Sequence, residues 1–305
     1  MSVFTPLTTA QIVPWLATHG IAELHQYRGI AGGTVNTNYW LTTDDGEWIL
    51  TLVEDRDLAA VEPVMELMSA LAEQHLSVPQ VRRDQFGATV SLLANKPTTL
   101  VAALPGRQPE VTVESCDQVG RFLGQLHQQT LSLPPVAMNF GPTWQAERVA
   151  AWMTRLPAEK ATHLRLSWQR LATLWEVDLP MAWTHGDLFP DNALFDEGHL
   201  SAVIDWYFAS WAPCLWDVAV AINAWCGASP LSTPTIDALL AGYQALRPLS
   251  NLEQRWLPAM REAAALRFWL SRLDAQAQAE ASDTVTIKSP DEQEHMLLDL
   301  QHLHG

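Results

Sequence analysis

Lysine is scarce in this chain. The 305 residues include three lysines, Lys96, Lys160 and Lys288, and 34 acidic residues stand against 18 basic ones, which gives a formal net charge of −16. Nucleic-acid binding draws on clustered Lys and Arg side chains. The charge balance therefore argues against a nucleic-acid partner, and any bound polyanion must be neutralised mostly by metal and by a few local cations.

Cysteines and long apolar runs are also few. Cys116, Cys214 and Cys226 show no CxxC spacing and cannot all pair with one another, so we expect buried thiols in a reducing compartment. The N-terminus has no basic segment followed by an apolar one, and no apolar run is long enough to cross a bilayer. We therefore expect a cytoplasmic protein with no membrane partner.

The first third of the chain combines strand patterns with two helices. Apolar periodicity predicts one helix over residues 9–18 and a second that starts at Pro63, because proline is favoured in a first turn. A turn signal at residues 44–46 indicates a hairpin. Strands are predicted at residues 24–27, 38–42, 48–53, 80–82, 89–92 and 98–102.

The remainder of the chain has mostly helical patterns, which one hairpin interrupts. Helices are predicted over residues 113–129, 145–155, 159–175, 215–225, 235–245 and 252–275. This order of elements favours an α+β fold with two lobes. We expect a small sheet-containing lobe over residues 1–103, which binds nucleotide, and a larger helical lobe over residues 104–305, which holds the catalytic and substrate groups.

The most informative segment is HGDLFPDN, from His185 to Asn192, followed by Asp205 in VIDW. In kinase active sites a loop aspartate accepts the proton of the substrate hydroxyl, an asparagine five residues later binds magnesium, and a second aspartate completes the metal site. Those places fall to Asp187, Asn192 and Asp205. The spacing therefore predicts phosphoryl transfer that uses ATP and Mg²⁺.

A hairpin between these residues supports the metal assignment. Apolar runs at 193–195 and 202–204 flank a turn signal at 196–198, and a hairpin brings its two ends together. Asn192 and Asp205 are therefore expected to reach one ion, with the oxygen ligands that magnesium prefers. Taken singly, each residue is more typical of a turn that caps its own backbone; the combination favours the functional interpretation.

With these residues in hand, the chain resembles homoserine kinases of the aminoglycoside-phosphotransferase and choline kinase-like type, which have a protein kinase-like fold. The segments GTVNTNYW, WILTLVE, WDVAVAINAWC and ALRFWLSRL extend the resemblance over almost the full length. It implies ATP-dependent phosphorylation of the side-chain hydroxyl of L-homoserine. The product would be O-phospho-L-homoserine, for threonine synthesis.

The resemblance also implies roles for individual residues. Asp187 would be the catalytic base or orient the hydroxyl, while His185 would shape the loop. Asp217 would hold the loop from the helix behind it, although an exposed carboxylate at the start of a helix is an equal alternative. The residues expected to contact ATP are Gly32, Gly33, Thr34, Asn36, Asn38, Ala102, Ala103 and Leu104.

Homoserine is a zwitterion, so its site needs a donor for the carboxylate. Arginine suits this task, and Arg267 and Arg272 on a late helix are the candidates. Asp191 and Asn223 are candidates for further polar contacts. The alternative is that arginines on such a helix are solvated or packed by their stems.

One departure from related kinases concerns the strand WILTLVE. It carries Thr51 where the wider superfamily often has a cation, so Glu66 loses its obvious partner. Arg56 could substitute, although a solvated loop residue is the favoured interpretation of it. The alternatives for function are a kinase of choline or ethanolamine, methylthioribose or an aminoglycoside, or a non-catalytic nucleotide-binding protein. The oligomeric state is left open.

Overall fold

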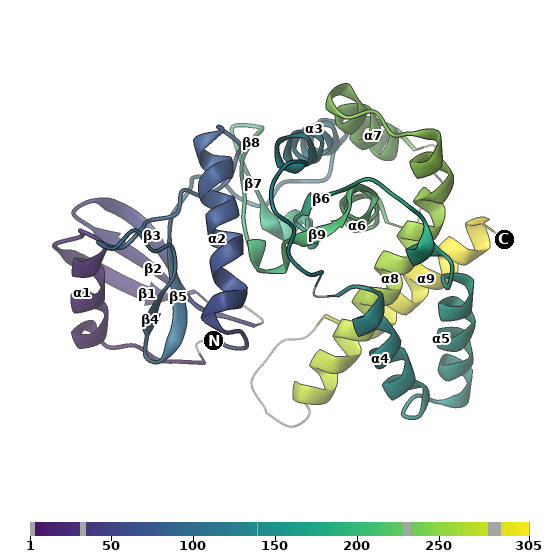
Figure 1. Ribbon diagram of the computed structural model, residues 1–305, viewed down its shortest axis with the longest axis horizontal. Helices are drawn as coiled ribbons and strands as arrows, with labels where there is room; N and C mark the ends of the chain where they lie inside the picture. The colour runs from purple at the N-terminus through teal and green to yellow at the C-terminus, as the bar shows by residue number, and fades with distance from the viewer. Residues whose placement is uncertain (1–3, 31–34, 139, 228–232, 280–287, 305) are drawn as a thin grey trace. The chain divides into compact units, whose positions relative to one another are not determined.

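The computed structural model describes residues 4–30, 35–138, 140–227, 233–279 and 288–304 (Figure 1). Their contacts divide the chain into two compact units. Of the described residues, the N-terminal unit holds those before Arg107 together with Ser201–Tyr207, and the C-terminal unit holds Arg107–Leu200 and those from Phe208 onward. Asp205 therefore belongs to the N-terminal unit, although the HGDLFPDN segment belongs to the other.

The N-terminal unit is built on a five-stranded antiparallel sheet. In spatial order its strands are β1 (Leu24–Gly29), β2 (Thr37–Thr43), β3 (Gly46–Leu52), β5 (Lys96–Ala102) and β4 (Ser91–Leu93). Burial alternates along β2, because every second side chain enters the core. Tyr39 lies opposite Leu50, which lies opposite Leu100, and these three pack with α1 (Thr9–Thr18). The other face of the sheet carries Asn38 and the side chains that alternate with the buried ones along β2.

Helix α2 (Leu58–Glu73) begins earlier than the sequence predicts. Its start is set by Asp57, whose side chain accepts a hydrogen bond of 2.9 Å from the backbone N–H of Ala60. Pro63 lies inside the helix, so the prediction that the helix begins there is wrong. The strand predicted at residues 80–82 is also wrong, since that segment forms one isolated bridge through Val81.

The C-terminal unit is mostly helical, and the predicted α+β class is confirmed. The helices are α3 (Val113–Thr130), α4 (Pro142–Met153), α5 (Ala158–Arg170), α6 (Cys214–Cys226), α7 (Pro234–Leu246), α8 (Asn251–Ala279) and α9 (Pro290–His304). Single turns of 3₁₀ helix lie at Leu174–Glu176, Pro190–Asn192 and Trp206–Phe208. Across the described ranges, no helix is long and apolar enough to traverse a membrane.

The sequence missed two features of this unit. Helix α9 lies against α8, and no helix was predicted there although Met296, Leu300 and Leu303 recur at helical spacing. Strands β6 (Met181–Thr184) and β9 (Ser210–Pro213) pair antiparallel, although each is four residues long. The predicted hairpin is confirmed as β7 (Ala193–Asp196) and β8 (His199–Val203), which form a separate two-stranded sheet.

Helices α3 and α7 lie side by side in unusually close contact (Figure 1). A Cβ atom added at Gly120 would lie 2.0 Å from the backbone oxygen of Leu239, and one added at Gly242 would lie 2.2 Å from that of Asp117. Such distances are far below van der Waals contact, so any side chain at either position would push the helices apart. Two glycines therefore let the backbones of α3 and α7 meet directly.

Candidate active site

The HGDLFPDN loop leaves β6 through a sharp turn at Gly186. Its φ of +76° lies in the left-handed region, and a Cβ atom there would be 2.9 Å from the backbone oxygen of Phe208. Glycine satisfies both conditions without strain. The turn directs Asp187 out of the buried strand end, and its side chain is 18% exposed, so it can reach a small molecule in solvent.

Asn192 holds Asp187 from the far end of the loop. Its side-chain nitrogen donates to the backbone oxygen of Asp187 at 2.8 Å and to the carboxylate Oδ2 at 3.2 Å. The backbone N–H of Phe189 donates to the same backbone oxygen at 2.8 Å. Because the amide nitrogen of Asn192 is engaged inside the loop, its oxygen is the atom that can serve a cation.

His185 is fully buried beneath the loop. Its Nδ1 accepts a hydrogen bond of 3.2 Å from the backbone N–H of Asp187, and its own backbone N–H donates to Asp217. Both contacts are with the backbone of the loop or with its anchor. These two contacts are typical of a histidine that shapes the loop, which is the role that the family resemblance implied.

Asp217, in the first turn of α6, anchors the loop from below. Its two carboxylate oxygens accept from the backbone N–H groups of His185 and Gly186, each at 2.7 Å, and Oδ2 also lies 3.2 Å from Nε2 of His127. The side chain has no exposed surface. The alternative of an exposed carboxylate is therefore wrong: the charge is buried and is compensated by hydrogen-bond donors.

The anchor continues through three more side chains, of which Tyr243 and Glu253 are buried and Arg247 is 11% exposed. Nδ1 of His127 lies 2.9 Å from the hydroxyl of Tyr243, and that hydroxyl lies 2.8 Å from Nη1 of Arg247, which pairs with Glu253 at 2.8 Å. These residues come from α3, α7, the segment after α7, and α8. Sequence reasoning missed them because they are far apart in the chain. One available signal was a histidine on the otherwise apolar face of α3.

Arg267 lies beside Asp187. Its Nη1 is 3.8 Å from Oδ1 of Asp187, and its side chain is 4% exposed. The guanidinium carbon lies 4.0 to 5.2 Å from the centroids of three aromatic rings, those of Phe140, Phe208 and Phe268. The alternative that this arginine is solvated is wrong, since the rings hold a buried cation next to the carboxylate.

The other polar candidates of the C-terminal unit contact different groups. Arg272 donates at 2.7 Å to Glu292 of α9, so it joins the last two helices. Asp191 pairs at 2.8 Å with Lys288, and both side chains are about half exposed, at 47% and 56%. Contact of Arg272 or Asp191 with substrate stays a prediction.

Asn223 links two helices beneath the site. Its amide oxygen accepts from Nε of Arg261 at 2.9 Å, and its amide nitrogen donates to the backbone oxygen of the same residue at 2.8 Å. Nearby on α6, the indole N–H of Trp225 donates to the backbone oxygen of Leu188 at 3.0 Å. The first contact joins α6 to α8 and the second joins α6 to the loop, while a substrate contact of Asn223 stays a prediction.

In the N-terminal unit, hydroxyl and amide groups occupy the place of the expected cation. Thr51 is buried and donates to the amide oxygen of Asn38 at 2.7 Å. The buried Asn36 accepts from the backbone N–H of Glu54 at 3.4 Å. At the end of β5, the backbone N–H of Ala103 donates to the backbone oxygen of Glu47 at 2.9 Å.

Of the other residues expected to bind nucleotide, Ala102 ends β5 and pairs with β3, and Leu104 follows in the segment without regular structure. Gly32, Gly33 and Thr34 lie outside the described residues. Their assignment to ATP stays a prediction.

Arg56 is the cation that approaches Asp205. Its guanidinium donates to the backbone oxygen of Tyr207, and the side chain is 15% exposed. Burial lowers the pKa of Arg56, while the charges of Asp55 and Asp205 oppose that shift. The interpretation of Arg56 as a solvated loop residue is therefore wrong.

Asp205 has a left-handed backbone, with a φ of +63°. Two residues later the Tyr207 hydroxyl lies 2.8 Å from that of Thr99, and burial raises the pKa of Tyr207 to about 12. Glu66 also has a partner, because Arg83 binds it with two hydrogen bonds of 2.8 Å. Glu66 therefore pairs with Arg83 in place of the strand lysine that it lacks.

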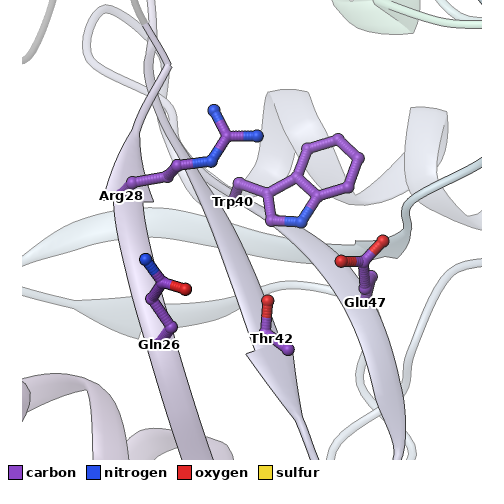
Figure 2. Close-up of a pocket in the computed structure, with 5 residues that line it drawn as sticks. All are labelled: Gln26, Arg28, Trp40, Thr42 and Glu47. Atoms are coloured by element: carbon purple, nitrogen blue, oxygen red, sulfur yellow. The ribbon is translucent and has the colours of Figure 1, made fainter.

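A small pocket opens on the sheet face that carries Asn38 and Thr51. Its volume is about 200 Å³, and Figure 2 shows the guanidinium of Arg28 beside the ring of Trp40, 5.2 Å from the ring centroid. The register places the lining side chains on one face of β1, β2 and β3. Its lining residues are Gln26, Arg28, Trp40, Thr42 and Glu47.

The family follows from the whole sequence. The chain belongs to the phosphotransferase enzyme family, which it matches over residues 26–252. In particular, it is 37% identical over 312 residues to a homoserine kinase of Pseudomonas aeruginosa strain LESB58, with 99% of this chain and 98% of that protein covered. A homoserine kinase of Granulibacter bethesdensis is 35% identical over 305 residues, covering 97% of this chain and 96% of that protein.

A solved structure shows the same fold. The amicoumacin kinase hAmiN, determined with AMP-PNP, Ca²⁺ and amicoumacin, superposes with a TM-score of 0.74 at 14% identity and covers 97% of this chain and 93% of its own. The protein kinase-like fold predicted from the sequence is confirmed.

Proposed function

We propose that this protein transfers the terminal phosphoryl group of ATP to the side-chain hydroxyl of L-homoserine. The observation that carries the proposal is the match to homoserine kinases over 99% of the chain at 37% identity. The loop geometry supports it, since Asp187 is both held and solvent-accessible. The product is O-phospho-L-homoserine, an intermediate of threonine synthesis. The cytoplasmic location expected from the sequence stays a prediction.

Asp187 orients the acceptor hydroxyl and takes its proton as the new O–P bond forms. Phosphoryl transfer asks for little covalent work from the protein, so alignment and charge compensation supply most of the rate. The hydrogen bond from Asn192 fixes the rotamer of the carboxylate through Oδ2. Oδ1 is then the oxygen that faces the acceptor.

Mg²⁺ is the metal that this donor set fits. Magnesium takes oxygen ligands and usually keeps water and phosphate oxygens in its shell, so one or two protein ligands are enough. Asn192 offers an amide oxygen and Asp205 a carboxylate. Within the described part of the chain, no group of three or more His, Cys, Asp or Glu side chains could hold a metal. When bound, the ion would neutralise charge on the phosphate oxygens.

ATP binds on the open face of the N-terminal sheet. Trp40 offers an aromatic ring for the base, and Asn38 lies nearer the segment that joins β1 to β2. Arg56 is the cation proposed for the phosphates, because its charge interacts with that of Asp205. It takes the electrostatic role that a strand lysine has in protein kinases.

Arg267 binds the homoserine carboxylate. A guanidinium pairs with a carboxylate through two parallel hydrogen bonds, and its burial among aromatic rings strengthens that pairing. At 3.8 Å from Asp187 it lies within the length of a four-carbon amino acid whose hydroxyl points at the same aspartate. An acceptor that lacks a carboxylate would leave Arg267 without this partner.

A coupled assay of ADP release tests the function. L-Homoserine, choline, methylthioribose and kanamycin are supplied as separate acceptors, with and without Mg²⁺. We expect magnesium-dependent turnover with homoserine far above that with the other three. Turnover with one of the others and none with homoserine would refute the proposal. ATP binding without turnover of any acceptor would instead indicate a non-catalytic nucleotide-binding protein.

A further inference from the structure

The hydroxyl of Tyr243 lies between two nitrogen atoms beneath the catalytic loop. Nη1 of Arg247 is 2.8 Å from it on one side, and Nδ1 of His127 is 2.9 Å from it on the other. Neither the tyrosine nor the histidine has exposed surface, so solvent does not replace either contact. Tyr243 comes from α7, and it is connected to the HGDLFPDN loop through His127 and Asp217.

The direction of each hydrogen bond in this series follows from which groups can donate and which can accept. Arginine has donors and no acceptor, so Arg247 donates to the tyrosine oxygen. The tyrosine oxygen could also accept from His127, but the buried hydroxyl proton would then have no acceptor; the arrangement that satisfies every group directs that proton at Nδ1 of His127. An imidazole that accepts at Nδ1 is neutral and carries its proton on Nε2. That N–H faces Oδ2 of Asp217, 3.2 Å away.

We propose that Tyr243 and Arg247 are positioning residues for phosphoryl transfer. Together they hold His127 in the Nε2–H tautomer, so that Asp217 receives three N–H donors and keeps the backbone of His185 and Gly186 in place. With the opposite tautomer, the lone pair of Nε2 would face the carboxylate, and the buried Asp217 would lose one of its donors. The proposal concerns rate and so rests on the proposed function, whereas the tautomer does not.

The groups around this series of hydrogen bonds keep Arg247 charged and Tyr243 protonated. The groups that face Tyr243 and His127 are Asp217 and Cys214 from α6, Arg247 after α7, and Glu253 from α8. Glu253 is 1% exposed and pairs with Arg247, which keeps the guanidinium charged and oriented. Burial raises the pKa of the Tyr243 hydroxyl, so it retains the proton that it donates.

Tyr243→Phe removes the hydroxyl alone and is the sharpest variant. We expect kcat for homoserine to fall on the order of tenfold, with both KM values within about twofold, because groups behind a catalytic residue act on its placement. Arg247→Lys retains a donor and should keep most of the rate, whereas Arg247→Met should behave like Tyr243→Phe. Tyr39→Phe is the matched control, since it removes a buried hydroxyl that bonds to Leu7 in the other unit.

The tautomer itself is read by ¹⁵N NMR of histidine-labelled protein, with His127 assigned by its loss in His127→Gln. In the parent we expect one protonated ring nitrogen, Nε2, and one pyridine-like nitrogen, Nδ1, and in Tyr243→Phe a mixture of tautomers. A proton on Nδ1 in the parent would overturn the proposal. So would a parental kcat in Tyr243→Phe. If the parent does not phosphorylate homoserine, the proposed function fails, and the spectrum still decides the tautomer.

Discussion

The two units hold their functional aspartates in different ways. In the C-terminal unit, Asp187 sits on a loop whose backbone is bound by the buried carboxylate of Asp217. In the N-terminal unit, Asp205 has a left-handed backbone and lies near the guanidinium of Arg56, while the residues around Thr51 are neutral. One unit uses buried charge to fix a backbone, and the other places an aspartate near an arginine whose side chain is 15% exposed.

The difference suits the two tasks proposed for the units. Orientation of a hydroxyl tolerates little displacement, so the loop is made rigid before the acceptor arrives. A nucleotide brings its own metal and four negative charges, so its site needs compensating charge more than internal hydrogen bonds. The scarcity of lysine makes this division sharper, because Arg56 is the basic side chain found near Asp205 among the described residues of the N-terminal unit.

The largest effect is expected for Asp187→Asn. The amide cannot take the proton of the acceptor, so kcat should fall by about 10³-fold or more, while the Kd of Mg-ATP stays close to that of the parent. Rates come from the coupled assay and binding from calorimetry. Asp178→Asn, an exposed carboxylate of the same unit, is the control. A variant with the parental rate would show that Asp187 is not the base.

Asp217→Asn tests the C-terminal unit, in which a buried carboxylate binds the backbone of the loop. The amide offers one acceptor oxygen in place of two, so a backbone N–H of the loop is left buried without a partner. We expect kcat to fall about 100-fold and the free energy of unfolding to fall by about 3 kcal/mol. Denaturant unfolding and initial rates measure the two effects. Loss of stability with an unchanged rate would mean that the anchor serves the fold alone.

Arg56→Gln tests the N-terminal unit, in which the charge of Arg56 lies near that of Asp205. Loss of one charge-assisted contact to phosphate is worth about 1.4 kcal/mol, so KM for ATP should rise about tenfold while KM for homoserine stays the same. The control is Arg165→Gln, which removes an exposed arginine of α5. Equal KM values for ATP in the two variants would remove Arg56 from the nucleotide site.

The smallest effect is expected for Glu54→Gln, just after β3 in the N-terminal unit. Burial raises the pKa of Glu54, but hydrogen bonds from Lys96 and Thr37 outweigh it, and the net pKa lies below the ordinary 4.5. A carboxyl group with a lowered pKa stabilises the fold above its unfolded pKa, and that contribution is lost as pH falls through the folded value.

The variant should therefore lose about 1 kcal/mol of unfolding free energy at pH 7. The parent and the variant should converge below about pH 4. Unfolding curves at pH 7, 5 and 3.5 measure the difference. A constant difference at all three values would show that the carboxylate charge contributes nothing.

The sequence predicted the fold class, and it also predicted the hairpin after the HGDLFPDN loop, because their signals are local. The spacing of Asp187 and Asn192 is set within eight residues, and the hairpin that follows carries its own turn signal. The early helix start at Asp57 was missed because a cap competed with the preference of Pro63 for a first turn. Two strands of four residues, β6 and β9, carry too few residues for an alternating pattern.

The support beneath the loop could not be predicted for a different reason. Asp217 and His127 are 90 residues apart, and hydrogen bonds over such a separation leave no pattern in a single sequence. Burial of Arg267 likewise depends on rings from three separate segments. Whether Asn192 and Asp205 share one metal stays a prediction, because the two residues belong to different units.

The direct backbone contact between α3 and α7 limits how this protein can change. His127 and Tyr243 are carried by these two helices, so their separation is set where Gly120 and Gly242 meet the opposite backbone. An alanine at either glycine would push α3 and α7 apart. The distance between His127 and Tyr243 would then change, and with it the support of the loop. Substitutions that change the acceptor are therefore expected outside the α3–α7 contact, because a change there would also displace His127 and Tyr243.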